Sequence, residues 1–139
     1  MNFLTPKQVL FIHSRLVTET GESHGLRDLA LLESAVARPR ATFDSKELYP
    51  DLFTKAAALM DSLINNHPFL DGNKRTGITA TGLFFRINGW KLTASSEELV
   101  ACTMRVAVEG LEMDDLANWL RAKTIKSKSK IRTTFPNRD

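Results

Sequence analysis

The 139-residue chain has the length of one ordinary domain, and its 42% hydrophobic and 25% charged residues exclude a disordered or fibrous protein. It has no apolar run of about 18 residues, the length that a membrane-spanning helix needs, and its first residues do not form a secretory signal. A single cysteine, Cys102, excludes a disulfide scaffold. We therefore expect one soluble domain, without a membrane partner, in the cytoplasm.

The net charge of +3 is unevenly distributed along the chain. Residues 1–120 carry 12 Lys and Arg against 15 Asp and Glu, whereas the last 19 residues carry 7 against one acidic residue. We predict a folded domain over residues 1–122 and a basic, flexible tail over residues 123–139. The alternative is a tail that binds nucleic acid, which has weak support because Phe135 is its one aromatic residue.

The first half of the chain contains clear signals for helix starts and stops. A capping box over residues 5–8 begins a helix that runs to about Thr20. Asp28 caps a second helix, and Pro39 ends it. Residues 40–50 show no helical period, which predicts a loop or a short hairpin.

The second half predicts mainly helices as well. Asp51 caps a third helix, which runs through Asn66 and has few polar faces, so we expect it to be central. The remaining predicted elements are a helix from about Asn73 to Asn88, an extended stretch over residues 90–92, a helix from Ser95 to Gly110 and a helix over about residues 114–123. Six helices with little strand indicate an all-α, bundle-like domain.

Residues 67–76, HPFLDGNKRT, join the third and fourth helices and carry most of the chemically reactive side chains. Backbone N–H groups at a helix start attract anions, because they lack partners within the helix and the helix dipole is positive there. Lys74 and Arg75 would oppose that dipole unless an anion is bound. A polar turn with Asp71 as a cap and solvated cations is the alternative interpretation.

Individual side chains of this segment suit phosphate chemistry. Asp71 comes just before the helix start, where a carboxylate beside phosphates can hold Mg²⁺. His67 carries an imidazole, a group whose ordinary pKa of about 6.5 suits proton abstraction from a hydroxyl. We expect Phe69 to anchor the loop in the core. His13, in the first helix, has no acidic or Cys partner at ligand spacing, and we assign it no chemistry.

The segment HPFLDGNKRTG resembles the signature of the Fic/Doc family, His-x-Phe-x-(Asp/Glu)-Gly-Asn-x-Arg. The matching positions are His67, Phe69, Asp71, Gly72, Asn73 and Arg75. Lys74 and Thr76 are also similar to the Doc (death-on-curing) toxins, and the resemblance covers roughly residues 5–120. It implies a compact six-helix Fic/Doc-like bundle with a short loop or hairpin flap.

Two departures from the wider family bear on the reaction. Most Fic proteins transfer AMP, and they have a glycine in place of Lys74 and a second arginine in place of Ile78. Doc toxins share both departures, so the resemblance implies a protein kinase that transfers the γ-phosphate of ATP to a threonine of elongation factor Tu and arrests translation. An AMP transferase and a non-catalytic nucleic-acid-binding partner are the alternatives.

The resemblance also implies a role for each motif residue. His67 would be the general base, Asp71 the Mg²⁺ ligand, and Lys74 and Arg75 the cations that hold the ATP phosphates. Further implied ATP contacts are Gly72, Asn73 and Thr76.

The resemblance finally implies a partner and a flap. Many Fic proteins carry an inhibitory helix with the pattern (Ser/Thr)-x-x-x-Glu-(Gly/Asn), which residues 18–23 match except at the last position. We therefore expect inhibition in trans by a Phd-type antitoxin. Residues 40–50 would form the flap that aligns the target.

Overall fold

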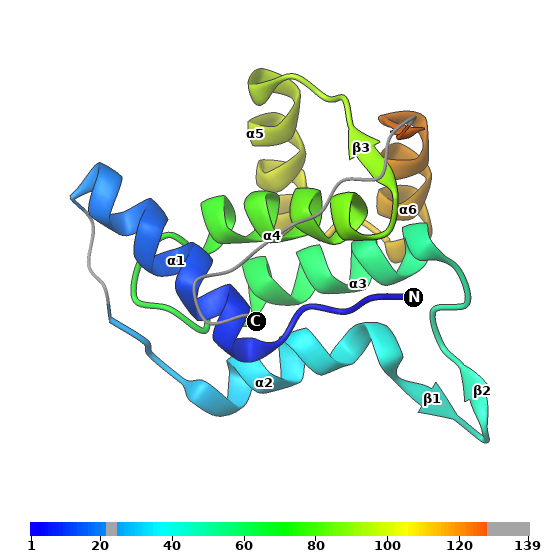
Figure 1. Ribbon diagram of the computed structural model, residues 1–139, viewed down its shortest axis with the longest axis horizontal. Coiled ribbons are helices and arrows are strands. Elements are labelled where there is room, and N and C mark those ends of the chain that lie inside the picture. The colour runs from blue at the N-terminus through cyan, green and yellow to red at the C-terminus, as the bar shows by residue number, and fades with distance from the viewer. Residues whose placement is uncertain (22–24, 128–139) are drawn as a thin grey trace.

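The computed structural model describes residues 1–21 and 25–127 (Figure 1). Within these ranges, six α-helices confirm the predicted all-α fold. They are α1 (Pro6–Thr20), α2 (Leu29–Ala37), α3 (Leu52–Asn65), α4 (Asn73–Ile87), α5 (Ser96–Met104) and α6 (Met113–Ala122). A 3₁₀ turn (Arg38–Arg40) follows α2, and a π-helical turn (Arg105–Glu109) continues α5. The four short strands are β1 (Thr42–Phe43), β2 (Lys46–Glu47), β3 (Trp90–Leu92) and β4 (Thr124–Lys126).

Most of the helices begin at a side-chain cap, as the sequence predicts. Thr5, Asp28, Asp51 and Ser95 each accept a hydrogen bond from the backbone N–H three residues later. The start of α4 differs, because its cap residue is Gly72, which has no side chain to accept such a bond. The first amide groups of α4 therefore lack a side-chain cap.

The third helix is central, as predicted. It packs against α2, α4 and α6 (Figure 1), and Ala56, Ala58 and Leu63 on it are fully buried. The small alanines let neighbouring helices approach closely, so α3 and α4 lie side by side and hold both ends of the loop that joins them. In the part of the chain that the structure describes, no helix combines the length and the apolar character needed to cross a bilayer.

The predicted hairpin is present between α2 and α3. Its strands pair antiparallel, and Asp44 and Ser45 at the turn both have positive φ, of 53° and 64°, as a two-residue hairpin turn requires. The buried Lys55 of α3 anchors it, donating to the carboxylate of Glu47 and to the carbonyl of Tyr49. This hairpin lies at the opposite end of the long axis from the α3–α4 loop (Figure 1), so its position does not support the expected role as a flap.

The structured part of the chain extends further than predicted. β4 pairs antiparallel with β3, and the backbone N–H of Ser127 donates to the carbonyl of Gly89 at 2.8 Å. The predicted start of the flexible tail at residue 123 is therefore too early, because the backbone of β3 offers this segment a strand partner. Residues 128–139 of the predicted tail lie outside the described residues.

The first turn of α5 is tied to the end of α6. Lys123 forms an ion pair with Glu98, and this hydrogen bond, together with one from the backbone of Ser95, lowers the pKa of Glu98 to about 2. The contact links α6 to the start of α5, which forms one wall of the candidate site.

Candidate active site

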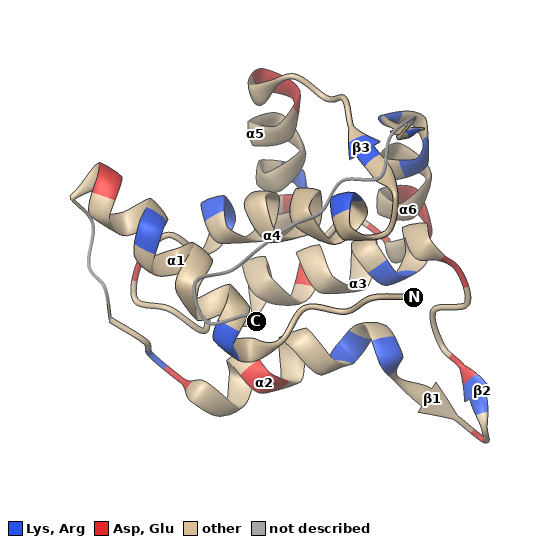
Figure 2. Cartoon of the chain, in the orientation of Figure 1, with Lys and Arg blue, Asp and Glu red and all other residues tan. Residues whose placement is uncertain are grey.

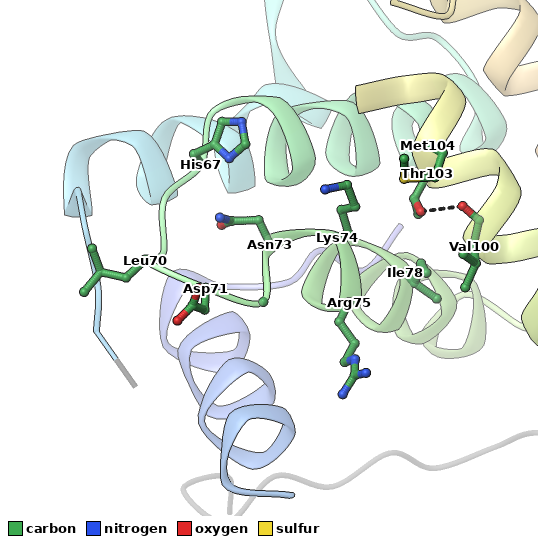
Figure 3. Close-up of a pocket in the computed structure, with 11 residues that line it drawn as sticks. His67, Leu70, Asp71, Asn73, Lys74, Arg75, Ile78, Val100, Thr103 and Met104 are labelled. Atoms are coloured by element: carbon green, nitrogen blue, oxygen red, sulfur yellow. Dashed lines mark hydrogen bonds between the residues drawn. The ribbon is translucent and has the colours of Figure 1, made fainter. Parts of the chain in front are cut away.

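A pocket of about 460 Å³ opens where the α3–α4 loop meets α5 (Figure 3). Six residues that the sequence analysis singled out line one wall of it: His67, Asp71, Gly72, Asn73, Lys74 and Arg75. The side chains of His67, Lys74 and Arg75 are exposed, so a ligand in the pocket could reach them. The structure thus brings the predicted residues together at the start of α4.

The two cations of this wall point in different directions. Figure 3 shows the ammonium group of Lys74 directed toward the side of the pocket where His67 lies. The guanidinium group of Arg75 extends from the other side of the helix start, away from His67. Of the two cations, Lys74 is therefore the one that this conformation directs toward the imidazole.

The side chain of Asn73 closes the loop on itself. Its Oδ1 accepts a hydrogen bond from the backbone N–H of Phe69 at 3.0 Å, and its Nδ2 donates to the carbonyl of Phe69 at 2.9 Å. Both ends of the amide are thus engaged within the loop. In this conformation Asn73 braces the loop, and because it also lines the pocket, its contact with ATP stays a prediction.

The loop rests on two rings in the core. Phe69 is 1% exposed, which confirms that it anchors the loop, and it stacks on His13 with centroids 3.7 Å apart and planes at 5°. His13 Nε2 donates to the carbonyl of Asp71 at 2.8 Å, because a carbonyl can only accept. A Cβ at Gly72 would lie 3.3 Å from Val17 Cγ1 and 3.5 Å from the His13 ring, so this glycine with φ of +79° suits both the turn and the close packing.

A short segment before α2 holds the outer side of the loop. The guanidinium of Arg27 donates to the carbonyls of His67 and Asn66, at 2.6 and 2.8 Å. The backbone N–H groups of Arg27 and Asp28 both donate to the carbonyl of Pro68, at 2.8 and 3.0 Å. The loop is thus held from the core by α1 and from the outside by this segment. His13, to which the sequence gives no chemistry, has a structural role here, whereas no sequence signal pointed to Arg27.

The opposite wall of the pocket belongs to α5 and is largely apolar. Val100 and Met104 are 56% and 46% exposed and face Ile78 of α4 across the pocket. Thr103 is buried, and its hydroxyl donates to the carbonyl of Val100 at 2.8 Å (Figure 3). Cys102 packs in the core, where burial raises the pKa of its thiol. No motif in the sequence connects this helix with the site.

Thr76 does not line the pocket, although the resemblance implied that it contacts ATP. It lies one turn into α4 on the face turned to the core, is fully buried, and its hydroxyl has no hydrogen-bond partner among the described residues. Helical geometry explains the difference, because two residues beyond Lys74 the side chain has turned by about half a helical turn.

Replacing this threonine by the isosteric valine tests its assignment to the core. Because an unsatisfied buried hydroxyl carries a desolvation cost, we expect Thr76→Val to raise the free energy of unfolding by about 1 kcal/mol and to leave enzymatic activity unchanged. Urea unfolding and the transfer assay described below measure the two effects. A loss of nucleotide affinity in Thr76→Val would restore the contact with ATP that the resemblance implied.

Comparisons with known proteins agree with this site. A model of the Fic/DOC family matches residues 3–85. The chain is 43% identical over 97 residues to "Toxin Doc" of Mycolicibacterium smegmatis, covering 66% of this chain and 72% of that protein. It is 28% identical over 121 residues to "Protein kinase doc" of Escherichia phage P1, covering 87% and 94%. The chain therefore belongs to the Fic/DOC family, as the motif at residues 67–75 indicates.

Proposed function

We propose that this chain is a Doc-type toxin of a type II toxin–antitoxin system, with protein kinase activity in the cytoplasm. The reaction is transfer of the γ-phosphate of ATP to a threonine hydroxyl of elongation factor Tu, which arrests translation. The observation that carries the proposal is the pocket at the start of α4, which both His67 and Lys74 line. The similarity to a toxin and to a protein kinase by name gives further support.

The residues around the pocket fit a magnesium nucleotide. An anion can bind the amide groups at the start of α4, which lack a side-chain cap, and Asp71 supplies a carboxylate of the kind that holds Mg²⁺ beside phosphates. Lys74 lies where it balances the charge of a phosphate near His67. Arg75, which also lines the pocket, is the second cation for the phosphates. When bound, ATP with Mg²⁺ supplies an activated phosphoryl group.

The protein then contributes a base and a set of positioning groups. His67 takes the proton of the target hydroxyl as that oxygen bonds to the γ-phosphorus, while the bond from phosphorus to the bridging oxygen breaks and ADP departs. Lys74 stabilises the negative charge on the transferred group. Asn73 keeps the loop closed, so that base and cation stay on the same side of the pocket.

Two residues favour phosphate transfer over AMP transfer. Lys74 occupies the position where AMP-transferring relatives have glycine, and its long side chain extends into the pocket. Ile78 lines the pocket with an apolar side chain where those relatives have a second arginine. The resulting site has fewer groups that can bind the distal phosphates of ATP. It also has less room for the α-phosphate beside Lys74. The nucleic-acid-binding alternative depends mainly on residues 128–139, outside the described part of the chain.

Inhibition by a separate protein completes the proposal. A relative named as a toxin supports a cognate antitoxin for this chain, and we propose one of the Phd type that folds on the protein and blocks the pocket.

The decisive experiment compares transfer of label from ATP labelled at the γ- or the α-phosphate to purified elongation factor Tu, for wild type and His67→Ala. We expect label from the γ-position alone, and none with the variant. Label from the α-position would make the protein an AMP transferase. The absence of transfer from either position would exclude elongation factor Tu as the target.

A further inference from the structure

The motif loop has a second point of control in Arg27, a residue outside the motif. The Nε of Arg27 donates to the carbonyl of His67 at 2.6 Å, and Nη2 donates to the carbonyl of Asn66 at 2.8 Å. Both carbonyls follow the last turn of α3, where the negative end of the helix dipole favours a cation. The planar fork of a guanidinium can bond two neighbouring acceptors at fixed geometry, which a lysine cannot do.

The backbone at His67 needs such support. Its φ is +50°, a left-handed conformation that is unfavourable for a residue with a Cβ and that persists where surrounding contacts enforce it. The segment before α2 also forms backbone hydrogen bonds with the loop, but at residues that come after His67. Leu26 pairs with Phe69, and the N–H of Leu70 donates to the carbonyl of Gly25. The guanidinium bond reaches His67 itself.

We infer that Arg27 is a positioning residue for the reaction, holding the backbone of His67 in the left-handed conformation that directs the imidazole to the pocket. The inference rests on the proposed function for its catalytic consequence. It does not require Arg27 to contact nucleotide or target, and Arg27 is not among the residues that line the pocket.

The first test measures transfer kinetics for Arg27→Ala, Arg27→Lys and a matched control, Arg86→Ala, at the far end of α4. We expect Arg27→Ala to lower kcat about tenfold to hundredfold with the KM for ATP unchanged, because the base is misplaced while the phosphate site stays intact. Arg27→Lys should recover part of the loss, since an ammonium can bond one of the two carbonyls. Arg86→Ala should behave as wild type. An unchanged kcat in Arg27→Ala would overturn the inference.

The second test separates positioning from general stability. In the His67→Ala background, Arg27→Ala should cause no further loss of the residual activity, because the residue that it positions is already absent. An equal additional loss in that background would overturn the inference.

A third readout does not depend on activity. In NMR spectra, Arg27→Ala should shift the backbone and ring signals of His67 strongly, whereas Arg86→Ala should leave them in place. Unchanged His67 signals in Arg27→Ala would overturn the inference. If the wild type transfers no phosphate to any target, the proposed function fails, and these spectra still decide whether Arg27 sets the conformation of His67.

Discussion

Replacing His67 by alanine is expected to abolish growth arrest and to lower phosphate transfer by about 10²–10⁴-fold, the usual contribution of a general base. The side chain is exposed and lines the pocket, so its removal leaves no cavity in the core. We therefore expect thermal unfolding to stay close to that of wild type. Plating efficiency after induction, together with the transfer assay, measures the loss.

A second variant at this position controls for the backbone. Asparagine adopts the left-handed conformation more readily than most residues, so His67→Asn keeps the φ of +50° and a polar side chain while removing the proton acceptor. We expect it to be as inactive as His67→Ala and as stable as wild type. Equal toxicity of wild type and both variants would show that His67 is not the base.

Local sequence signals explain how much of the fold was predictable. Helix caps act over three or four residues, so Thr5, Asp51 and Ser95 predict helix starts without knowledge of the tertiary structure. The strand β4 was not predictable in the same way, because its residues resemble a basic tail and become a strand through pairing with β3. Such pairing depends on the tertiary contact and leaves little trace in the sequence.

The candidate site also has a part that local sequence predicts and a part that it does not. One contiguous segment, the α3–α4 loop and the first turn of α4, carries His67, Asp71 and Lys74, so the motif alone brings them to one pocket. The residues that hold the loop come from elsewhere: His13 acts across 58 residues and Arg27 across 40. Nothing in the spacing of a single sequence connects such positions.

The position of the hairpin in the chain matches the flap that the family resemblance implies, but its position in the fold does not. The segment between α2 and α3 forms the expected hairpin, but the length of α3 separates it from the loop that carries the motif (Figure 1). Figure 2 shows basic and acidic residues on several of the described helices along this axis. A target that reaches His67 must therefore approach through the pocket beside α5, away from the hairpin.

The second large effect is expected from Phe69→Ala, which should lower the free energy of unfolding by about 3–5 kcal/mol. Phe69 is 1% exposed and stacks on His13, so truncation removes buried apolar surface, opens a cavity and leaves the His13 ring without its partner. A loss of this size is a large part of the 5–15 kcal/mol that typically stabilises a domain. Urea unfolding measures it as a lower midpoint.

A matched control is Phe43→Ala in the hairpin, where the ring is 74% exposed and the same truncation should change the free energy of unfolding by less than about 0.5 kcal/mol. Equal losses of unfolding free energy in Phe69→Ala and Phe43→Ala would show that burial of the ring does not determine the loss. Phe69→Leu then separates anchoring from folding. If Phe69→Leu stays folded while phosphate transfer still falls, the stacked ring must affect the reaction through the loop. The reason is that His13, on which Phe69 stacks, donates to the carbonyl of Asp71 in that loop.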